Sequence, residues 1–438
     1  MRIARKHLAV PAAIAAAAMA LAGCGAGGDT AGGGDVKLSE EPVTLHIAWW
    51  GSDTRVKMTE DVIAKFEAAN PNIKVETEYK DWSGYWDNLA THIAGGDMPD
   101  VIQMDELYLA SYASQGTLYD LGKTSEYLDL NQMDSSLRDM GKVGGTQYAA
   151  PIASTPMGIV VNNDLLKKLG LTLPDTSKWT WDDMLDFAKQ AVEKSNGEIT
   201  GITPLNNGMG LQLWARQNNE ALFKDSKVTI SEATLASYLQ MAYDWSHGDQ
   251  VAGSPDRMAE GSAGTVDQGD MAQNKQLMSF TQATQIGTYS KASGSDMSLI
   301  PMPNLGKNAK YGYLKPGMYW AMAAKTEHPA EAAKLIDFLI NNEEAGKTLG
   351  TDRGIPGNNK IREALASSAD DTSKKALEFP STIEDTLGEA PEITPNGASD
   401  LDKTISRYEQ QVYFGQKSSA DAAKEMIAEL QSAIDSAA

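Results

Sequence analysis

The chain has 438 residues, of which 38 are Lys or Arg and 59 are Asp or Glu, so its formal net charge is −21. This length predicts about two to four domains, because a domain usually holds roughly 100–200 residues. The acidic balance argues against a nucleic-acid partner, since binding phosphates requires basic surface. It also argues against a protein lying flat on an anionic membrane, which attracts basic segments.

The N-terminus has the layout of a secretory signal. Arg2, Arg5 and Lys6 precede an apolar run over residues 8–22, which is shorter than the ~20 residues of a transmembrane helix. The run ends in Leu-Ala-Gly-Cys at residues 21–24, a pattern that resembles the lipobox of bacterial lipoproteins. The resemblance implies that the signal is cut before the cysteine, whose thiol then carries a lipid.

We therefore expect residues 1–23 to be a lipoprotein signal peptide and Cys24 to be the lipidation site. Cys24 is the only cysteine of the chain, and a single thiol cannot form a structural disulfide within one chain. Residues 24–42 are rich in Gly, Ala, Ser, Thr and acidic residues, a composition typical of a flexible tether. The folded body would then be held at the membrane surface.

The segment that follows the tether alternates between strand and helix patterns. Apolar spacing and β-rich composition predict a strand over residues 43–48, a helix whose apolar stripe spans 62–69, a strand over 73–77, a helix over 85–94 and a strand from 100. The dipeptide Asn70-Pro71 ends the first of these helices. Strands that alternate with helices indicate a parallel sheet with right-handed crossovers.

The middle and the end of the chain continue this α/β pattern. Residues 158–161 predict a strand, 164–169 a helix ended by Gly170, 253–269 a long surface loop, and 401–412 and 420–434 two C-terminal helices. Another helix begins at Pro329. Thr180 and Asp183 form the capping box of a helix, and we interpret the neighbouring Trp179 and Trp181 as structural residues.

Catalytic motifs are weak. The glycines 23, 25 and 28 match a dinucleotide-binding spacing, but no strand precedes them and no helix follows. The sequence has no G-x-S-x-G elbow, and its histidines at 46, 92, 247 and 328 are not spaced as metal ligands. Neighbouring carboxylates such as Asp105-Glu106 are better explained by helix starts and solvated faces than by a glycosidase pair. We expect no enzyme activity, no cofactor and no metal ligands in the site, and the sequence leaves open whether a metal ion is bound structurally.

The aromatic residues favour a binding cleft. Nine Trp and 15 Tyr outnumber seven Phe, a bias typical of clefts that contain water. Trp49, Trp50, Trp82 and Trp86 fall at predicted strand ends or helix starts, and ligands of open α/β sheets bind beyond the carboxyl ends of the strands. A sugar stacks its apolar face on an indole ring and pairs its hydroxyl groups with polar side chains. Strand alternation would point Trp49 away from Trp50, so we favour a core position for Trp49.

Several sequence blocks, in order, resemble one family. They are FEAANPNIKV at residues 66–75, GDMPDV at 96–101, GTLYDL at 116–121, YAAP at 148–151 with VNNDL at 161–165, AAKLIDFL at 332–339 and GIP at 354–356. Together, behind the lipobox, they resemble extracellular solute-binding protein family 1. These proteins are the substrate-binding lipoproteins of sugar ABC transporters, and the similarity is greatest to the maltose/maltodextrin-binding-like branch.

The resemblance implies an α/β protein with a two-lobe periplasmic-binding-protein-like fold of type II. Each lobe would be a mostly parallel sheet flanked by helices, and hinge crossovers would join the lobes. By the positions of the blocks, lobe one would comprise residues 43–153 plus 313–365, and lobe two residues 154–312 plus 366–438.

The resemblance also implies a ligand site between the lobes. The ligand-binding positions that it assigns are Trp50, Asp53, Arg55, Trp82, Trp86, Asp105, Ser154, Thr155, Trp214, Gln282, Tyr319 and Arg353. A Pro-Gly at 316–317 stands where the family often has Gly-Gly, so the choice between Tyr319 and Trp320 stays open. Arg353 has an equally good interpretation as an interlobe or surface charge.

The implied function is to capture an oligosaccharide between the lobes and to deliver it to the permease subunits of an ABC importer. The protein would be a monomer, lipid-anchored on the extracytoplasmic face of the cell membrane. An extracellular glycan-processing enzyme and a surface adhesin lipoprotein remain alternatives. The sequence does not identify the sugar, and Arg55 and Arg353 leave an acidic sugar open.

Overall fold

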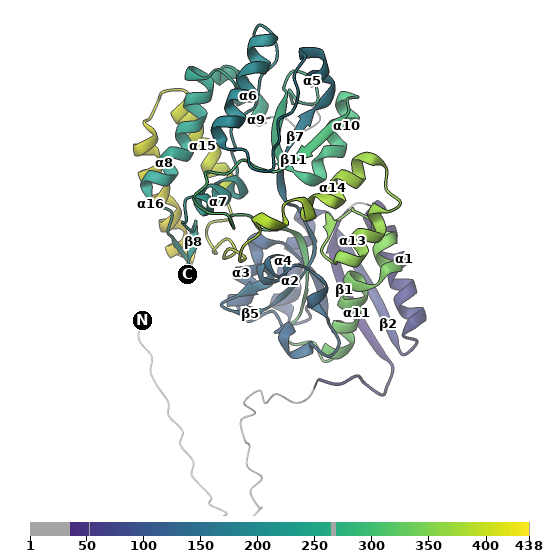
Figure 1. Ribbon diagram of the computed structural model, residues 1–438. Coiled ribbons are helices and arrows are strands. Elements are labelled where there is room, and N and C mark those ends of the chain that lie inside the picture. Colours follow the sequence, from purple (N-terminus) through teal and green to yellow (C-terminus); the bar gives the residue numbers. More distant parts are fainter. Residues whose placement is uncertain (1–35, 52, 264–268, 438) are drawn as a thin grey trace, which may run out of the picture. The chain divides into compact units, whose positions relative to one another are not determined.

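The computed structural model describes residues 36–51, 53–263 and 269–437 (Figure 1). The predicted signal peptide, Cys24 and most of the predicted tether lie outside the described residues. In the described ranges, no helix combines the length and apolar character that crossing a bilayer would require. The end of the predicted tether is held in place, since the backbone N–H of Ser39 donates to Glu331 at 2.5 Å.

The first part of the chain forms the predicted strand–helix–strand units. Strands β1 (Val43–Trp50), β2 (Ile73–Lys80) and β3 (Val101–Met104) pair in parallel, with α1 (Asp53–Ala69) and α2 (Trp82–Gly95) between them. This confirms the predicted elements and their parallel pairing. Strand β1 is longer than predicted, because Trp49 and Trp50 continue its ladder opposite Tyr79 and Lys80 of β2.

Three further strands complete the larger sheet, whose order is β13-β6-β12-β3-β1-β2. They are β6 (Ala149–Ser154), β12 (Pro316–Met322) and β13 (Ile355–Pro356). Strand β12 lies antiparallel to both β3 and β6, and β13 lies antiparallel to β6. The prediction of a mostly parallel sheet is therefore wrong beyond β1, β2 and β3. The chain leaves after β6 to form another sheet, and β12 returns running against its neighbours.

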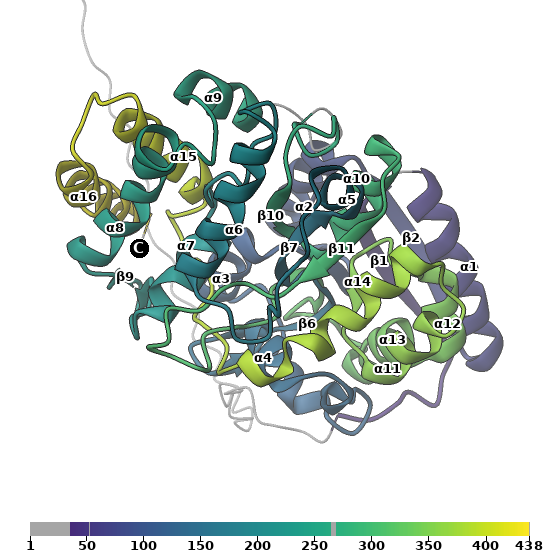
Figure 2. The ribbon, with the colours of Figure 1, turned by 45° about the horizontal axis from the view of Figure 1, so that its top comes forward.

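The smaller sheet has β7 (Met157–Asn162) between β10 (Met278–Gln282) and β11 (Met297–Ile300), side by side in Figure 2. Both neighbours run antiparallel to β7, so the predicted parallel arrangement is wrong for this sheet also. Every residue of β7 is buried, because helices cover it. The sheet contains the predicted strand at 158–161.

Helices flank both sheets, and the fold class is confirmed as α/β of the two-lobe type. The remaining helices are α3 (Glu106–Ser114), α4 (Ser135–Arg138), α5 (Asn163–Leu169), α6 (Trp181–Lys194), α7 (Gly208–Gln217), α8 (Glu232–Tyr243), α9 (Pro255–Ala263), α10 (Ile286–Ser293), α11 (Pro329–Asn341), α12 (Glu343–Leu349), α13 (Asn359–Ala366), α14 (Asp371–Thr382), α15 (Leu401–Tyr413) and α16 (Ser419–Ala437). Two short hairpins, β4 (Lys142–Val143) with β5 (Thr146–Gln147) and β8 (Phe223–Lys224) with β9 (Lys227–Val228), complete the elements. The residue limits given above for the lobes stay a prediction.

Local signals set several of these helices. Gly170 ends α5 in the left-handed region at φ 62°, and Thr180 and Asp183 cap α6 reciprocally, both as predicted. The helices predicted at 329 and at the C-terminus are confirmed as α11, α15 and α16. The surface loop predicted over 253–269 is wrong in its first half, where α9 forms. The N–H of Arg257 donates to Ser254 Oγ at the start of this helix, and the Arg257 side chain pairs with Asp270.

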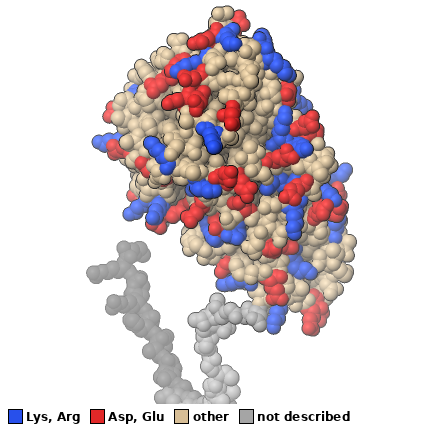
Figure 3. All heavy atoms as spheres, viewed as in Figure 1, with Lys and Arg blue, Asp and Glu red and all other residues tan. Residues whose placement is uncertain are grey.

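Charged side chains of both signs are interspersed over the face shown in Figure 3. The net negative charge therefore forms no single-sign patch on that face, in keeping with an ordinary solvated surface.

Candidate ligand-binding site

Six aromatic side chains gather where β1, α2 and α3 meet, and we call them the aromatic cluster. Its members are Trp50, Trp82, Tyr85, Trp86, Tyr108 and Tyr112. Trp50 is the last residue of β1, whereas the others lie on the first turns of α2 and on α3. Helices α2 and α3 begin just after the carboxyl ends of the parallel strands β2 and β3, which brings their first turns together at one edge of the sheet.

The rings of the cluster are packed in contact, but one is presented to solvent. The Trp50 and Trp82 ring centroids lie 5.0 Å apart edge to face, and those of Trp86 and Tyr108 lie 4.0 Å apart. Trp50 is only 7% exposed and supports the others, whereas Trp82 is 42% exposed. The indole N–H of Trp86 is buried and has no hydrogen-bond partner among the described residues. The cluster thus offers an apolar face, that of the exposed Trp82 ring.

A cavity of about 300 Å³, which we call the central cavity, is lined by residues near the larger sheet and by residues near the smaller sheet. From the side of the larger sheet come Asp105, Glu106 and Leu107 at the start of α3. From the side of the smaller sheet come Met157 of β7, Gln282 of β10 and residues 207–209 at the start of α7. The lining also includes Tyr313 and Lys315, which precede β12, and Asp402 of α15. Tyr108 of the aromatic cluster directly follows Leu107 in α3, but no member of the cluster is among the residues that line this cavity.

An ion pair lies in the wall of the central cavity. Glu106 Oε2 lies 3.2 Å from Lys315 Nζ, and Glu106 Oε1 accepts from the backbone N–H of Thr394 at 2.7 Å. Burial alone would raise the pKa of Glu106, but Lys315 and the Thr394 N–H outweigh burial and lower it. Burial raises the pKa of the neighbouring Asp105, whose carboxylate caps α3 by accepting from Leu107 N–H at 3.0 Å.

A cavity of about 280 Å³, the second-lobe cavity, lies beside the smaller sheet. It shares Asn207 with the central cavity. Phe280 of β10 lines it, and the Phe280 ring stacks on Trp245 at 6.3 Å. Asn207 also caps α7, since its side-chain oxygen accepts from Gly210 N–H. The shared residue makes the two cavities adjacent parts of one candidate site.

The two predicted arginines belong to one buried network. Arg55 Nε lies 2.6 Å from Asp352 Oδ2, and Arg353 Nε donates to Gln103 Oε1 at 3.0 Å. Arg353 is 5% exposed, and burial, with a smaller contribution from Arg55, lowers its pKa to about 9. Both arginines therefore pair with protein groups, Arg55 with Asp352 and Arg353 with Gln103.

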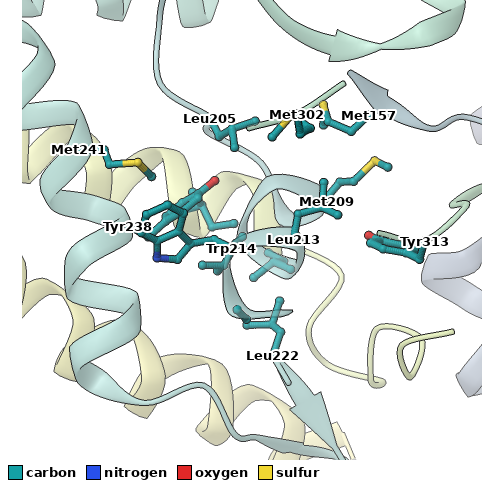
Figure 4. Close-up of a cluster of buried hydrophobic side chains, with 14 of the residues drawn as sticks. Met157, Leu205, Met209, Leu213, Trp214, Leu222, Tyr238, Met241, Met302 and Tyr313 are labelled. Atoms are coloured by element: carbon teal, nitrogen blue, oxygen red, sulfur yellow. The ribbon is translucent and has the colours of Figure 1, made fainter. Parts of the chain in front are cut away.

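Other predicted residues are covered by protein. Tyr319 and Trp320 are both fully buried, and the Tyr319 hydroxyl donates to Met140 O at 3.1 Å. Trp214 lies in the buried cluster of Figure 4, beside Tyr238, and its indole donates to Thr234 O at 3.2 Å. Trp214 is not among the residues that line either cavity.

The remaining predicted residues lie near the crossing segments or at the start of α1. Ser154 is buried, with a hydroxyl that has no partner among the described residues, and Thr155 Oγ1 donates to Lys315 O at 3.2 Å. Asp53 is exposed on the first turn of α1. The structure thus brings Trp50, Trp82 and Trp86 into one cluster, and it brings Asp105 and Gln282 into one cavity.

Several residues of this region were not predicted from the sequence: Tyr108 and Tyr112 of the aromatic cluster, Lys315 and Asn207 of the central cavity, and Glu409, which lines the second-lobe cavity. Tyr108 and Tyr112 are four residues apart on a helix that directly follows a predicted strand, which is a signal that could have found them. The others come from segments far apart in the chain, and only the fold brings them together. Among the described residues, no group of three or more His, Cys, Asp or Glu side chains could hold a metal ion.

The chain is similar in sequence to known bacterial proteins. Residues 51–346 match the family described as "Bacterial extracellular solute-binding protein". An uncharacterized lipoprotein of Streptomyces antibioticus is 27% identical over 182 residues, which are 41% of this chain and only 38% of that protein. The diacetylchitobiose binding protein DasA of Streptomyces coelicolor is 23% identical over 97% of this chain and 98% of its own length.

The fold also has solved counterparts. A periplasmic oligogalacturonide binding protein from Yersinia enterocolitica superimposes with a TM-score of 0.78. The two chains are 23% identical, and the match covers 90% of this chain and 99% of that one. At this identity the likeness establishes the fold alone.

Proposed function

Because the chain belongs to the bacterial extracellular solute-binding protein family, we propose that it is the substrate-binding lipoprotein of an ABC importer. It captures an oligosaccharide between its two lobes and delivers it to the permease subunits. The observation that carries the proposal is the half-exposed Trp82 ring, supported by Trp50 and Trp86 where β1 ends and α2 begins.

The site suits a sugar because it combines an aromatic surface with polar groups. One sugar ring stacks on Trp82, since an indole presents a flat apolar face. The hydroxyl groups then meet Asp105 and Gln282 in the central cavity. A ligand that contacts both lobes interacts more strongly with the closed state, so it shifts the conformational equilibrium toward closure.

In this proposal the sugar is released unaltered. Glycoside hydrolysis needs one carboxyl group as the acid and another as base or nucleophile, on either side of the scissile bond. Glu106 is a poor general acid, because Lys315 and the Thr394 N–H hold its pKa below the usual range. Its neighbour Asp105 is engaged in capping α3.

The lipid anchor at Cys24 would keep the protein, as a monomer, on the extracytoplasmic face of the cell membrane. The lipobox-like sequence at 21–24 supports this placement, and the relative in Streptomyces antibioticus is named a lipoprotein. Tethering raises the concentration of loaded protein near the permease.

Titration calorimetry on residues 24–438 with Cys24→Ser tests the function. The panel contains diacetylchitobiose, oligogalacturonides, and neutral oligosaccharides of glucose. We expect one-to-one binding near a micromolar Kd, about −8 kcal/mol, and recovery of the sugar intact by mass spectrometry. Cleavage of the bound sugar would support a glycan-processing enzyme instead, and absence of binding across the panel would contradict a sugar receptor.

A further inference from the structure

The second-lobe cavity contains a carboxyl group that the proposed site does not use. Glu409 of α15 is 3% exposed and lines this cavity. Its Oε1 atom has no hydrogen-bond partner among the described residues. Burying a polar group without a partner is unfavourable, so such groups in a cavity often meet a ligand.

The titratable neighbours of Glu409 do not neutralise it. Burial raises the pKa values of Tyr238 on α8 and Tyr413 on α15, and the nearby Glu409 raises them further. Neither tyrosine carries a positive charge. The Arg257 side chain lines the same cavity, but its Nε lies 2.6 Å from Asp270 Oδ2 and its Nη2 donates to Lys275 O.

The lining of the central cavity is rich in carboxylates. In the central cavity the acidic residues are Asp105, Glu106, Glu392 and Asp402, and the one basic residue among its described lining is Lys315, which pairs with Glu106. A sugar carboxylate placed here would face several like charges, and both cationic side chains lining the two cavities already have acidic partners. This charge distribution disfavours uronic acids and favours neutral sugars.

The second-lobe cavity also offers a surface for a sugar ring. The Phe280 ring stacks on Trp245 and packs at a tilt against Trp181, with ring centroids 6.3 and 5.7 Å away. Asn207 joins this cavity to the central one. A sugar chain in the central cavity can therefore extend past Asn207 toward Glu409.

We propose that the second-lobe cavity binds a terminal residue of a neutral oligosaccharide, and that the Glu409 carboxyl group forms hydrogen bonds with its hydroxyl groups. The inference rests on the proposed function and narrows its ligand class. Phe280 supplies the apolar contact, and the acidic lining of the neighbouring central cavity disfavours acidic sugars.

The test compares neutral, acidic and basic sugars by calorimetry, on the wild-type protein and on two variants. The probes are neutral di- to tetrasaccharides of glucose and N-acetylglucosamine, digalacturonate, and glucosamine disaccharide. We expect the tightest binder to be neutral. Glu409→Leu should weaken its binding at least tenfold, whereas Glu409→Gln, which keeps a hydrogen-bonding group of the same shape, should weaken it less than threefold.

Glu331→Leu is the matched control, because Glu331 is also buried but lies on α11, away from both cavities. Its sugar affinity should equal that of the wild type. Tighter binding of digalacturonate or of the glucosamine disaccharide, or an unchanged affinity in a folded Glu409→Leu, would overturn the inference. If Glu409→Leu does not fold, a loss greater than tenfold in Glu409→Gln would also overturn it.

The proposed function is tested separately in the same titrations. If Trp82→Ala loses affinity while Glu409→Leu does not, the oligosaccharide receptor stands and only the Glu409 subsite is wrong. If the wild-type protein binds no saccharide, the proposed function itself is contradicted.

Discussion

At the scale of single residues, tryptophans with similar sequence contexts have different environments. Trp49 is fully buried, as strand alternation predicts, whereas Trp50 is the buried base of the aromatic cluster. Trp82 is exposed because it is the first residue of α2, where the chain turns away from the sheet. Trp214 is buried although it was predicted from the family resemblance as a ligand contact. Residue type and block position predict which residues are near the site, but not which atoms remain open to a ligand.

Trp82 and Trp214 should respond differently to truncation. Trp82→Ala should weaken oligosaccharide binding by more than about 1 kcal/mol with little change in melting temperature, since the ring is half exposed and contributes mainly to the ligand contact. Trp214→Ala should lower the free energy of unfolding by about 3–5 kcal/mol, because it leaves a cavity in the core. Calorimetry and denaturant unfolding measure the two effects.

Tyr243→Ala is the control for Trp82, since Tyr243 is another exposed aromatic side chain and lies at the end of α8. Its affinity for sugar should match the wild type. A large loss of stability in Trp82→Ala, with sugar affinity unchanged, would assign that ring to the packing of the protein.

Glu409 should make stability depend on pH. Burial raises its pKa to about 8 in the folded protein, above the value near 4.3 of an unfolded chain. Between these pH values the unfolded state releases a proton that the folded state retains. The free energy of unfolding therefore falls as pH rises through this range, by up to about 1.4 kcal/mol per pH unit.

Glu409→Gln removes this titration, so its stability relative to wild type should rise between about pH 5 and pH 8 in urea unfolding experiments. If the free energies of unfolding of the two proteins changed with pH in the same way, the folded-state pKa of Glu409 would be near its ordinary value.

The candidate site is only partly predictable from single residues. Asp105 follows a predicted strand, and the structure places it in the central cavity with Gln282. The roles of Lys315 and Glu409 could not be predicted, because their partners are distant in sequence. Glu106, for example, meets Lys315 only after α3 and the segment before β12 have packed together.

At the scale of elements, local patterns predicted where helices and strands form but not how distant strands pair. The first three strands and their helices follow from apolar spacing, and their parallel order follows from the helix that connects each strand to the next. The direction of β12 was not predictable in this way, because it depends on how the chain returns to the sheet. Residues 255–263 were missed as a helix since their Gly, Ser and Asp content is typical of loops.

Position 354, in the turn before β13, should tolerate only glycine. Gly354 has φ +113°, and an added Cβ would lie 3.1 Å from Ala153 Cβ and 3.2 Å from Ser154 O. Gly354→Ala should lower the free energy of unfolding by more than about 2 kcal/mol, because conformational strain and crowding act together.

Gly96→Ala isolates the conformational part of this cost. Gly96 has φ +78°, and an added Cβ would meet nothing within 4 Å, so its cost should stay near about 1 kcal/mol. Equal losses in the two variants would show that crowding against β6 contributes nothing.

The contributions of Glu106 and Lys315 to the free energy of unfolding should be coupled, because their ion pair joins α3 to the segment before β12. Glu106→Leu should destabilise the protein by about 3 kcal/mol, because Lys315 is left without its partner in a largely buried place. Adding Lys315→Met should recover most of this loss. Urea unfolding of the two single variants and the double variant gives the coupling, and additive effects would contradict it.

At the scale of the whole molecule, the order of sequence blocks was more informative than any one motif. Each block is short, yet their order predicted the family and the two-lobe fold, and both are confirmed. The ligand stayed unpredicted, because the relatives share the fold while their names refer to different sugars. The charges that line a cavity depend on tertiary contacts and became visible only in the structure.

Closure of the two lobes around a sugar is tested most directly by small-angle X-ray scattering on residues 24–438 with Cys24→Ser. The saccharide that binds most tightly in calorimetry is added to saturation, and the radius of gyration is compared with that of the free protein. The proposed clamp predicts a smaller radius with sugar, and no such decrease for Trp82→Ala at a sugar concentration that saturates only the wild type. An unchanged radius at full saturation of the wild type would contradict capture by closure.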